Sequence, residues 1–208
     1  MRAPQLRTKD QQSVKRVAIA LLGPVWWAPP GVDPLKWRAV LAEDMVDLLA
    51  SLAQVDAAIA VDTADSDLAS AVAWPRMPVY ALSRPTVGAA LEAAAGDGYT
   101  EAAVLAGDAP DLPGLLVGKL LRPLSTRTVS VAPALDSGLL GVAARLPAPA
   151  WLADLDLDAD ADTLRAAAPT RSTVAAAPGW HRIRGPADLH RLDPALEGWA
   201  ATRALLGG

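Results

Sequence analysis

The sequence predicts an α/β fold with a mostly parallel central sheet, helices on both faces, and a small antiparallel addition in the C-terminal half. Short and almost continuously apolar runs, typical of strands buried on both faces, alternate with segments of helical periodicity. After residue 127 this alternation gives way to two short apolar runs joined by a tight loop. The chain has 208 residues, of which 52% are hydrophobic, so it can bury a substantial core. We expect one domain over residues 15–208 and a polar, disordered leader over residues 1–14.

The first strand is expected at Arg16–Leu22, where two charges precede an apolar run. This arrangement imitates the start of a signal peptide, but the polar leader before it favours a buried strand. A helix should follow, with Asp33 as its N-cap and Pro34 at its first position. One face of that helix carries apolar residues at spacings of three and four, which are Trp37, Leu41, Met45, Leu48 and Leu52.

The remaining elements are read from the same two periodicities. Further strands are expected at residues 56–62, 78–82, 101–107, 128–133, 138–146 and 172–177. Further helices are expected at residues 66–74, 86–96, 113–121 and 194–206, with a short one after the acidic segment that begins at residue 154. Residues 182–192 indicate a strand, a turn and a helix.

Composition excludes several classes of function. The net charge of −4 and the scattered Lys and Arg residues argue against a nucleic-acid-binding protein. The sequence contains no cysteine, and its two histidines lack zinc-site spacing, so any metal should be a hard ion held by oxygen. No apolar run reaches the ~20 residues that a membrane helix needs. We therefore expect a soluble and cytoplasmic protein.

Three segments, taken in order, resemble motifs of one bacterial family. "VLAGDAPDLP" is similar to a strand-end motif with the pattern G-[ST]-D-x-P-x-L, and "VAPALDSGLLGVAARLP" to a G-P-A-x-D-G-G-Y-Y-L-I-G-L motif. "RIRGPADLHRL" is similar to a closing D-V-D-T-P-x-D-L motif. The family comprises nucleotide-diphospho-sugar transferase-like proteins of the GT-A type, related to molybdenum-cofactor guanylyltransferase and phospholactate guanylyltransferase. The chain resembles a divergent member from about Val17 onward.

The resemblance gives the first motif a chemical role. It implies that Asp108, at the end of a parallel strand, is a catalytic residue that coordinates Mg²⁺ or Mn²⁺, and that the ion neutralises the diphosphate of a nucleotide donor. Asp111 would be a nearby second carboxylate in donor binding. Acidic turn residues are also common without any ligand, so Asp111 could instead cap the next helix, and Asp108 could serve only the loop amides.

The second motif implies a catalytic role for Asp136 on the acceptor or sugar side of the pocket. The sequence "DSG" would equally form a hairpin turn from turn chemistry alone. Leu139 and Leu140 stand where the family has two aromatic residues, usually tyrosines, so the family's usual acceptor is in doubt.

Two departures concern the grip on the donor. The family's first loop carries basic residues that bind phosphates, whereas here the loop contains Trp26 and Trp27. One of these tryptophans could stack on a base or sugar, or form a protein contact. In the third motif, Arg182 and Arg184 stand where acidic residues can complete the metal site. They could bind phosphates directly, or they could be solvent-facing charges on an edge strand.

The acidic run over residues 154–162 imitates an EF-hand loop. It lacks the glycine at the sixth position and the glutamate at the twelfth, where Arg165 falls. We interpret it as a solvated loop that leads into a helix.

These observations support two classes of function. The first is a metal-assisted glycosyl- or nucleotidyltransferase that uses a nucleotide or nucleotide-sugar donor and an unknown small-molecule acceptor. The second is a degenerate family member that binds a nucleotide or a partner protein without turnover, and the missing basic loop favours it. A weaker third hypothesis is a scaffold whose tryptophan loop forms a homo-oligomer contact.

Overall fold

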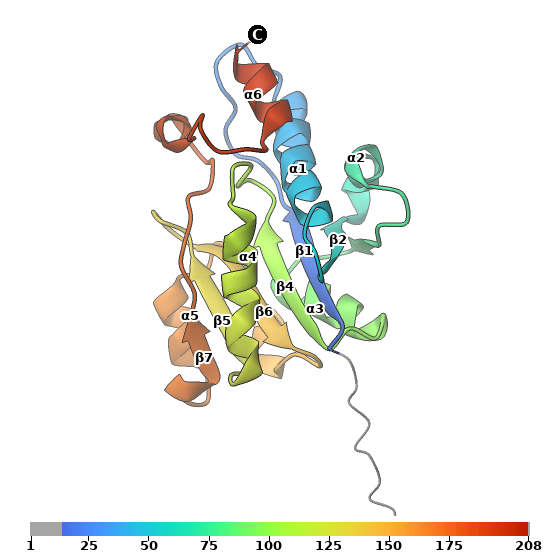
Figure 1. Cartoon of the computed structure of the whole chain (residues 1–208), viewed down its shortest axis with the longest axis vertical. Coiled ribbons are helices and arrows are strands. Elements are labelled where there is room, and N and C mark those ends of the chain that lie inside the picture. Colours follow the sequence, from blue (N-terminus) through green and yellow to red (C-terminus); the bar gives the residue numbers. More distant parts are fainter. Residues whose placement is uncertain (1–13, 208) are drawn as a thin grey trace, which may run out of the picture.

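The computed structural model describes residues 14–207, and the expected leader therefore lies outside the described residues apart from Val14. A seven-stranded sheet with the order β3-β2-β1-β4-β6-β5-β7 forms the centre of the molecule (Figure 1). β1 (Arg16–Leu22), β2 (Asp56–Asp62), β3 (Val79–Leu82) and β4 (Glu101–Ala106) pair in parallel. The predicted fold class is confirmed.

The antiparallel addition also lies in the C-terminal half, as predicted. β6 (Leu139–Arg145) runs antiparallel to both β4 and β5 (Val129–Pro133), and β7 (Val174–Ala176) joins the edge parallel to β5. β6 is buried along almost its whole length because it is inserted between two strands.

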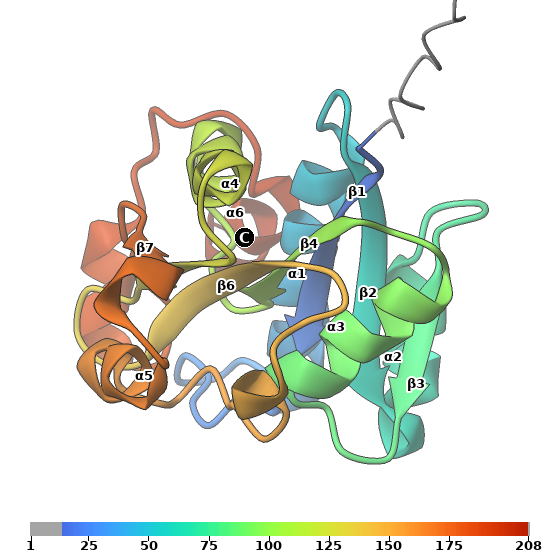
Figure 2. The ribbon, with the colours of Figure 1, turned by 90° about the horizontal axis from the view of Figure 1, so that it is seen from below.

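Helices cover both faces of the sheet, and each face has its own core (Figure 2). On one face lie α1 (Pro34–Ala50), α2 (Ser66–Val72) and α4 (Gly114–Leu121). On the other lie α3 (Val87–Gly96) and α5 (Ala161–Ala167). A third cluster joins Trp37 and Leu41 of α1 to Ile183 near the C-terminus. α6 (Ala200–Gly207) packs against α1, where the Asp44 carboxylate accepts hydrogen bonds from the backbone of Ala201 and Thr202.

The start of α1 follows the predicted capping chemistry. The Asp33 side chain accepts a hydrogen bond from the Lys36 amide at 2.9 Å, with Pro34 in the first turn. Thr86 caps α3 in the same way, and Asp160 caps α5 at the end of the acidic segment.

Two predicted elements are wrong in extent or type. The last helix begins at Ala200, not at residue 194, because Gly198 and Trp199 have φ values of +87° and +45° that no helix accommodates. Residues 182–184 form no strand, and a 3₁₀ helix (Pro186–Arg191) follows them. No helix within residues 14–207 has the length and apolar character needed to cross a bilayer.

Candidate functional site

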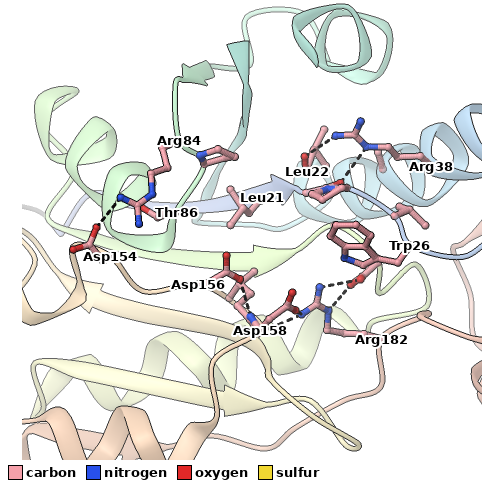
Figure 3. Close-up of a pocket in the computed structure, with 18 residues that line it drawn as sticks. Leu21, Leu22, Trp26, Arg38, Arg84, Thr86, Asp154, Asp156, Asp158 and Arg182 are labelled. Atoms are coloured by element: carbon pink, nitrogen blue, oxygen red, sulfur yellow. Dashed lines mark hydrogen bonds and ion pairs between the residues drawn. The ribbon is translucent and has the colours of Figure 1, made fainter. Parts of the chain in front are cut away.

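A cleft of about 290 Å³ opens at the carboxyl ends of the central strands. β1 pairs with β2 on one side and with β4 on the other. The chain first adds β2 and β3 on one side of β1 and then adds β4 on the opposite side, so the strand order reverses between β1 and β4. Open α/β sheets bind their ligands at such switch points. The cleft is lined by the loops after β1 and β4, by the loop before α3, and by segments near residues 156 and 182 (Figure 3).

A glycine allows the two central loops to approach each other closely. Gly107 follows β4, and its amide donates a hydrogen bond to the Leu21 carbonyl at 3.1 Å. A Cβ atom at Gly107 would lie 2.9 Å from the Leu22 side chain and 3.1 Å from the Leu21 carbonyl oxygen. Any larger residue would therefore push the Asp108 loop away from the end of β1.

Asp108 lines the cleft and forms a bidentate ion pair with Arg182. Arg182 Nε donates to Asp108 Oδ1 at 2.6 Å, and Nη2 donates to Oδ2 at 2.9 Å. Both side chains are largely buried, with exposed fractions of 12% for Arg182 and 13% for Asp108. Burial raises the pKa of Asp108, and the Arg182 guanidinium offsets part of that rise. The pair thus forms one wall of the cleft.

The backbone around Ile183 fixes this ion pair. The Ile183 amide donates to the Asp108 carbonyl at 2.7 Å, and the Ile183 side chain is fully buried in the cluster with Trp37 and Leu41. The neighbouring arginines consequently point toward the Asp108 side. The alternative of solvent-facing charges on an edge strand is wrong, because this segment crosses the strand ends without joining the sheet.

Arg182 and Arg184 also bind Asp158, although the sequence predicts a solvated loop at that residue. Arg182 Nη1 lies 3.3 Å from Asp158 Oδ1, and Arg184 Nη2 lies 2.5 Å from the same oxygen. Arg184 Nε is 3.9 Å from Asp108 Oδ2. The structure therefore brings together Asp108, Arg182 and Arg184, as proposed from the motifs, and adds Asp158 to them.

The acidic segment reaches the cleft because of a second glycine. Gly138 has a φ of +77°, and a Cβ there would lie 2.7 Å from the Leu157 carbonyl oxygen. This close approach lets Leu139 donate a backbone hydrogen bond to Leu157 at 2.7 Å. Asp154 and Asp156 line the cleft with Asp158. The sequence signal for this is that aspartate and leucine alternate over residues 154–158, which is typical of a segment with one packed face and one exposed face.

Asp111 points away from the cleft. Its side chain is fully buried, and Oδ1 accepts a hydrogen bond from Trp180 Nε1 at 3.1 Å. His181 Nε2 is 2.9 Å from the same oxygen, although its direction misses hydrogen-bond geometry. Asp111 therefore does not line the cleft with Asp108. It is a buried side chain that contacts Trp180 and His181.

Asp136 is also outside the cleft. It lies on the exposed loop between β5 and β6, where Arg191 Nη2 donates to Oδ1 at 2.8 Å and Nη1 contacts Oδ2. This guanidinium holds the pKa of Asp136 below its ordinary value. Asp136 thus does not line the cleft, although Arg184 Nη1 donates to the carbonyl of the adjacent Ser137 at 3.1 Å.

The loop after β1 divides its two tryptophans. Trp26 is 80% exposed and lines the cleft, whereas Trp27 packs edge-on against Trp37 with ring centroids 6.3 Å apart. Arg38 of α1 holds the loop, since its guanidinium donates to the carbonyls of Leu22 and Gly23 at 3.0 and 3.1 Å. The loop thus has a cation, contributed from the helix, but that cation binds backbone carbonyls and Asp65 at 2.7 Å.

The residues at Asp108 do not fit a divalent cation as they are arranged. Both carboxylate oxygens accept hydrogen bonds from Arg182, and Arg184 stands close by. Within residues 14–207, no three His, Cys, Asp or Glu side chains are grouped so that they could hold a metal ion. Metal coordination by Asp108 requires first that the guanidinium leave.

Comparison with known proteins identifies the fold. No family model matches the sequence, and no curated protein matches it. Among solved structures, a protein of Desulfovibrio desulfuricans G20 assigned to the nucleotide-diphospho-sugar transferases superposes with a TM-score of 0.62 at 21% identity, covering 94% of this chain and 96% of that one. 4-Diphosphocytidyl-2C-methyl-D-erythritol synthase of Anaerococcus prevotii DSM 20548 gives a TM-score of 0.58 at 11% identity, covering 92% and 96%.

A third similar structure was solved in complex with manganese. It is Rv0371c of Mycobacterium tuberculosis H37Rv, with a TM-score of 0.56 at 14% identity, covering 88% of this chain and 100% of that one. At these identities the likeness establishes the fold. The chain has the GT-A-like fold of nucleotide-diphospho-sugar transferases.

Proposed function

We propose that this protein binds the nucleotide part of a nucleotide or nucleotide-sugar donor in the strand-end cleft. The observation that carries the proposal is the position of the cleft at the switch point between β1 and β4 of this fold. Its volume of about 290 Å³ is close to the lower end of the range for small-molecule sites, roughly 300–1,000 Å³.

The cleft offers two kinds of group to such a ligand. Trp26 presents an aromatic face on which a base or a sugar ring can stack. Arg182 presents a guanidinium, the side chain best suited to bind phosphate oxygens. An aromatic face and a charged group in the same cleft match the base and the phosphates of a nucleotide.

Transfer of a glycosyl or nucleotidyl group is the larger prediction. Proteins named as transferases and synthases share this fold, and one similar structure contains manganese. In a transferase a bound metal would neutralise the donor phosphates. The Asp108–Arg182 pair favours the alternative function, a protein that binds the nucleotide without metal-assisted turnover.

A nucleotide panel tests the binding proposal. Thermal shift followed by calorimetry would compare guanine, cytosine and uridine nucleotides and their sugar conjugates, each with Mn²⁺ and with EDTA. A ligand at one hundred times its dissociation constant stabilises the folded state by about 2.7 kcal/mol, which such an assay resolves readily.

A pair of tryptophan variants tests whether the nucleotide binds in the cleft or elsewhere on the surface. Trp26→Ala should weaken binding of the responding nucleotide, while Trp74→Ala, which removes another exposed tryptophan outside the cleft, should not. If no nucleotide at millimolar concentration shifts the melting temperature of the folded protein, the donor-site proposal is wrong. If a nucleotide does bind, assays for release of pyrophosphate or nucleoside diphosphate from the donor distinguish a transferase from a protein that only binds the nucleotide.

A further inference from the structure

We infer that the guanidinium of Arg182 takes the place of a divalent cation at the end of β4, so that the native protein binds no metal at Asp108. The inference concerns the unliganded chain and does not depend on which ligand fills the cleft. It goes beyond nucleotide binding because it states which group neutralises the Asp108 carboxylate, namely a guanidinium and not a metal ion.

The first support is the chemistry of the atoms around Arg182. Its N–H groups meet two carboxylates and two backbone carbonyls, and every one of these partners is an oxygen. Apart from the Asp108 and Asp158 contacts, Nη1 lies 3.2 Å from the Leu139 carbonyl oxygen and 3.3 Å from that of Leu157. We call these four groups, Asp108, Asp158 and the carbonyls of Leu139 and Leu157, the Arg182 oxygen set.

Hard divalent cations bind this class of ligand. Mg²⁺, Mn²⁺ and Ca²⁺ prefer carboxylate and carbonyl oxygens, commonly with one or two carboxylates in the set. The Arg182 oxygen set has that composition, but a guanidinium satisfies it.

The second support is charge balance. Asp108 and Asp158 carry two negative charges, and Arg182 and Arg184 carry two positive charges in contact with them. A divalent cation entering this group would meet two guanidiniums a few ångströms away, in a partly buried place where screening is weak. Arginine does not lose its proton in proteins, so a change of pH does not remove this barrier.

The third support is that the fold holds the guanidinium in place. Ile183, the next residue, is buried against α1 and donates its amide to the Asp108 carbonyl. The hydrogen bond between the Ile183 amide and the Asp108 carbonyl therefore holds Arg182 and its partner Asp108 next to each other. Of its five N–H groups, one on Nη2 has no hydrogen-bond partner within the described residues, and Arg182 lines the cleft. If the proposed function is right, that group can bind a phosphate oxygen without a metal.

Manganese titration monitored by electron paramagnetic resonance tests the inference on the ligand-free protein. The wild-type chain should show no saturable Mn²⁺ binding tighter than roughly millimolar, the weak end of protein sites for hard cations. Arg182→Met and Arg184→Met, made together because Arg184 also binds Asp158, remove both positive charges while keeping long side chains, and this double variant should create a site for one Mn²⁺ per chain. Adding Asp108→Asn to that variant should abolish the site.

Arg84→Met is the matched control. Arg84 also borders the cleft and pairs with an aspartate, Asp154 at 3.2 Å, but it contacts no member of the Arg182 oxygen set. This variant should gain no Mn²⁺ site. Circular dichroism of every variant would show that it is folded.

Two results would overturn the inference. One is saturable Mn²⁺ binding by the wild-type protein that Asp108→Asn removes, since a native metal site would then exist. The other is a folded Arg182→Met/Arg184→Met variant that binds no Mn²⁺, since the oxygens would then not be a ligand set. If that double variant does not fold, Arg182→Gln/Arg184→Gln takes its place, and the wild-type and Asp108→Asn titrations still decide the first question. Because no nucleotide is present, failure here is distinct from failure of the donor-site proposal.

Discussion

The loops after β1 and β4 border the same cleft, and each separates two similar residues. In the β4 loop, Asp108 faces the cleft and Asp111 is sealed in the interior. In the β1 loop, Trp26 faces the cleft and Trp27 packs against Trp37. The residue that faces the cleft is available to a ligand, whereas its counterpart contributes to the fold.

The two loops differ in what holds them. Ionic and polar contacts from residues 180–182 hold the β4 loop, since Trp180 and His181 meet Asp111 while Arg182 meets Asp108. Apolar packing and the hydrogen bonds from Arg38 to backbone carbonyls hold the β1 loop. Substitutions should therefore disturb the β4 loop through unpaired polar groups and the β1 loop through lost packing.

The largest expected effect on stability is that of Asp111→Ala. It leaves Trp180 Nε1 buried without its acceptor and removes the carboxylate beside His181, which should lower the free energy of unfolding by about 3 kcal/mol. Asp108→Ala should cost less, about 1–2 kcal/mol, because Asp158 and two carbonyls still bind Arg182. Urea unfolding of both variants measures the difference. A larger loss for Asp108→Ala would show that the division between the two carboxylates is wrong.

The tryptophans should give an intermediate effect with the same asymmetry. Trp27→Ala should lower the free energy of unfolding by about 2 kcal/mol, because it empties part of the cluster around Trp37 and Ile183. Trp26→Ala should change stability by less than about 0.5 kcal/mol, since its side chain is mostly in solvent. Its effect should appear in nucleotide affinity, as a loss of roughly tenfold if a base stacks there. Unfolding curves and calorimetry of both variants, side by side, separate the two roles.

The smallest expected effect is a pH dependence in the β1 loop. The hydrogen bond from Arg38 lowers the pKa of Asp65, so the folded state favours the ionised carboxylate. The pair's contribution to stability is complete above the ordinary pKa of an aspartate and is lost as the pH falls through the lowered value. Because Asp65 is partly exposed, the contribution should be a few tenths of a kcal/mol. The stability difference between wild type and Asp65→Asn should shrink on acidification, and a constant difference would contradict this origin.

The sequence by itself determined the order and type of most elements. Apolar runs such as Arg16–Leu22 are strands because buried backbone must pair with a neighbour, and α1 starts at Pro34 because Asp33 caps it. The sequence also placed Asp108 at a strand end, where such sheets bind their ligands. These features depend on local spacing, which a single chain displays.

Only the tertiary structure decided which side chains meet at that strand end. Arg182 reaches Asp108 across 74 residues, Asp158 joins them from a segment that appeared merely solvated, and Arg38 turns from its helix to the β1 loop. Asp111, three residues from Asp108, points the other way. Local patterns do not encode such contacts, because they depend on how close distant backbones come, as at Gly107 and Gly138. A carboxylate at the end of a strand can bind a metal or an arginine. Here Ile183, buried against α1 and hydrogen-bonded to the Asp108 carbonyl, holds Arg182 beside that carboxylate.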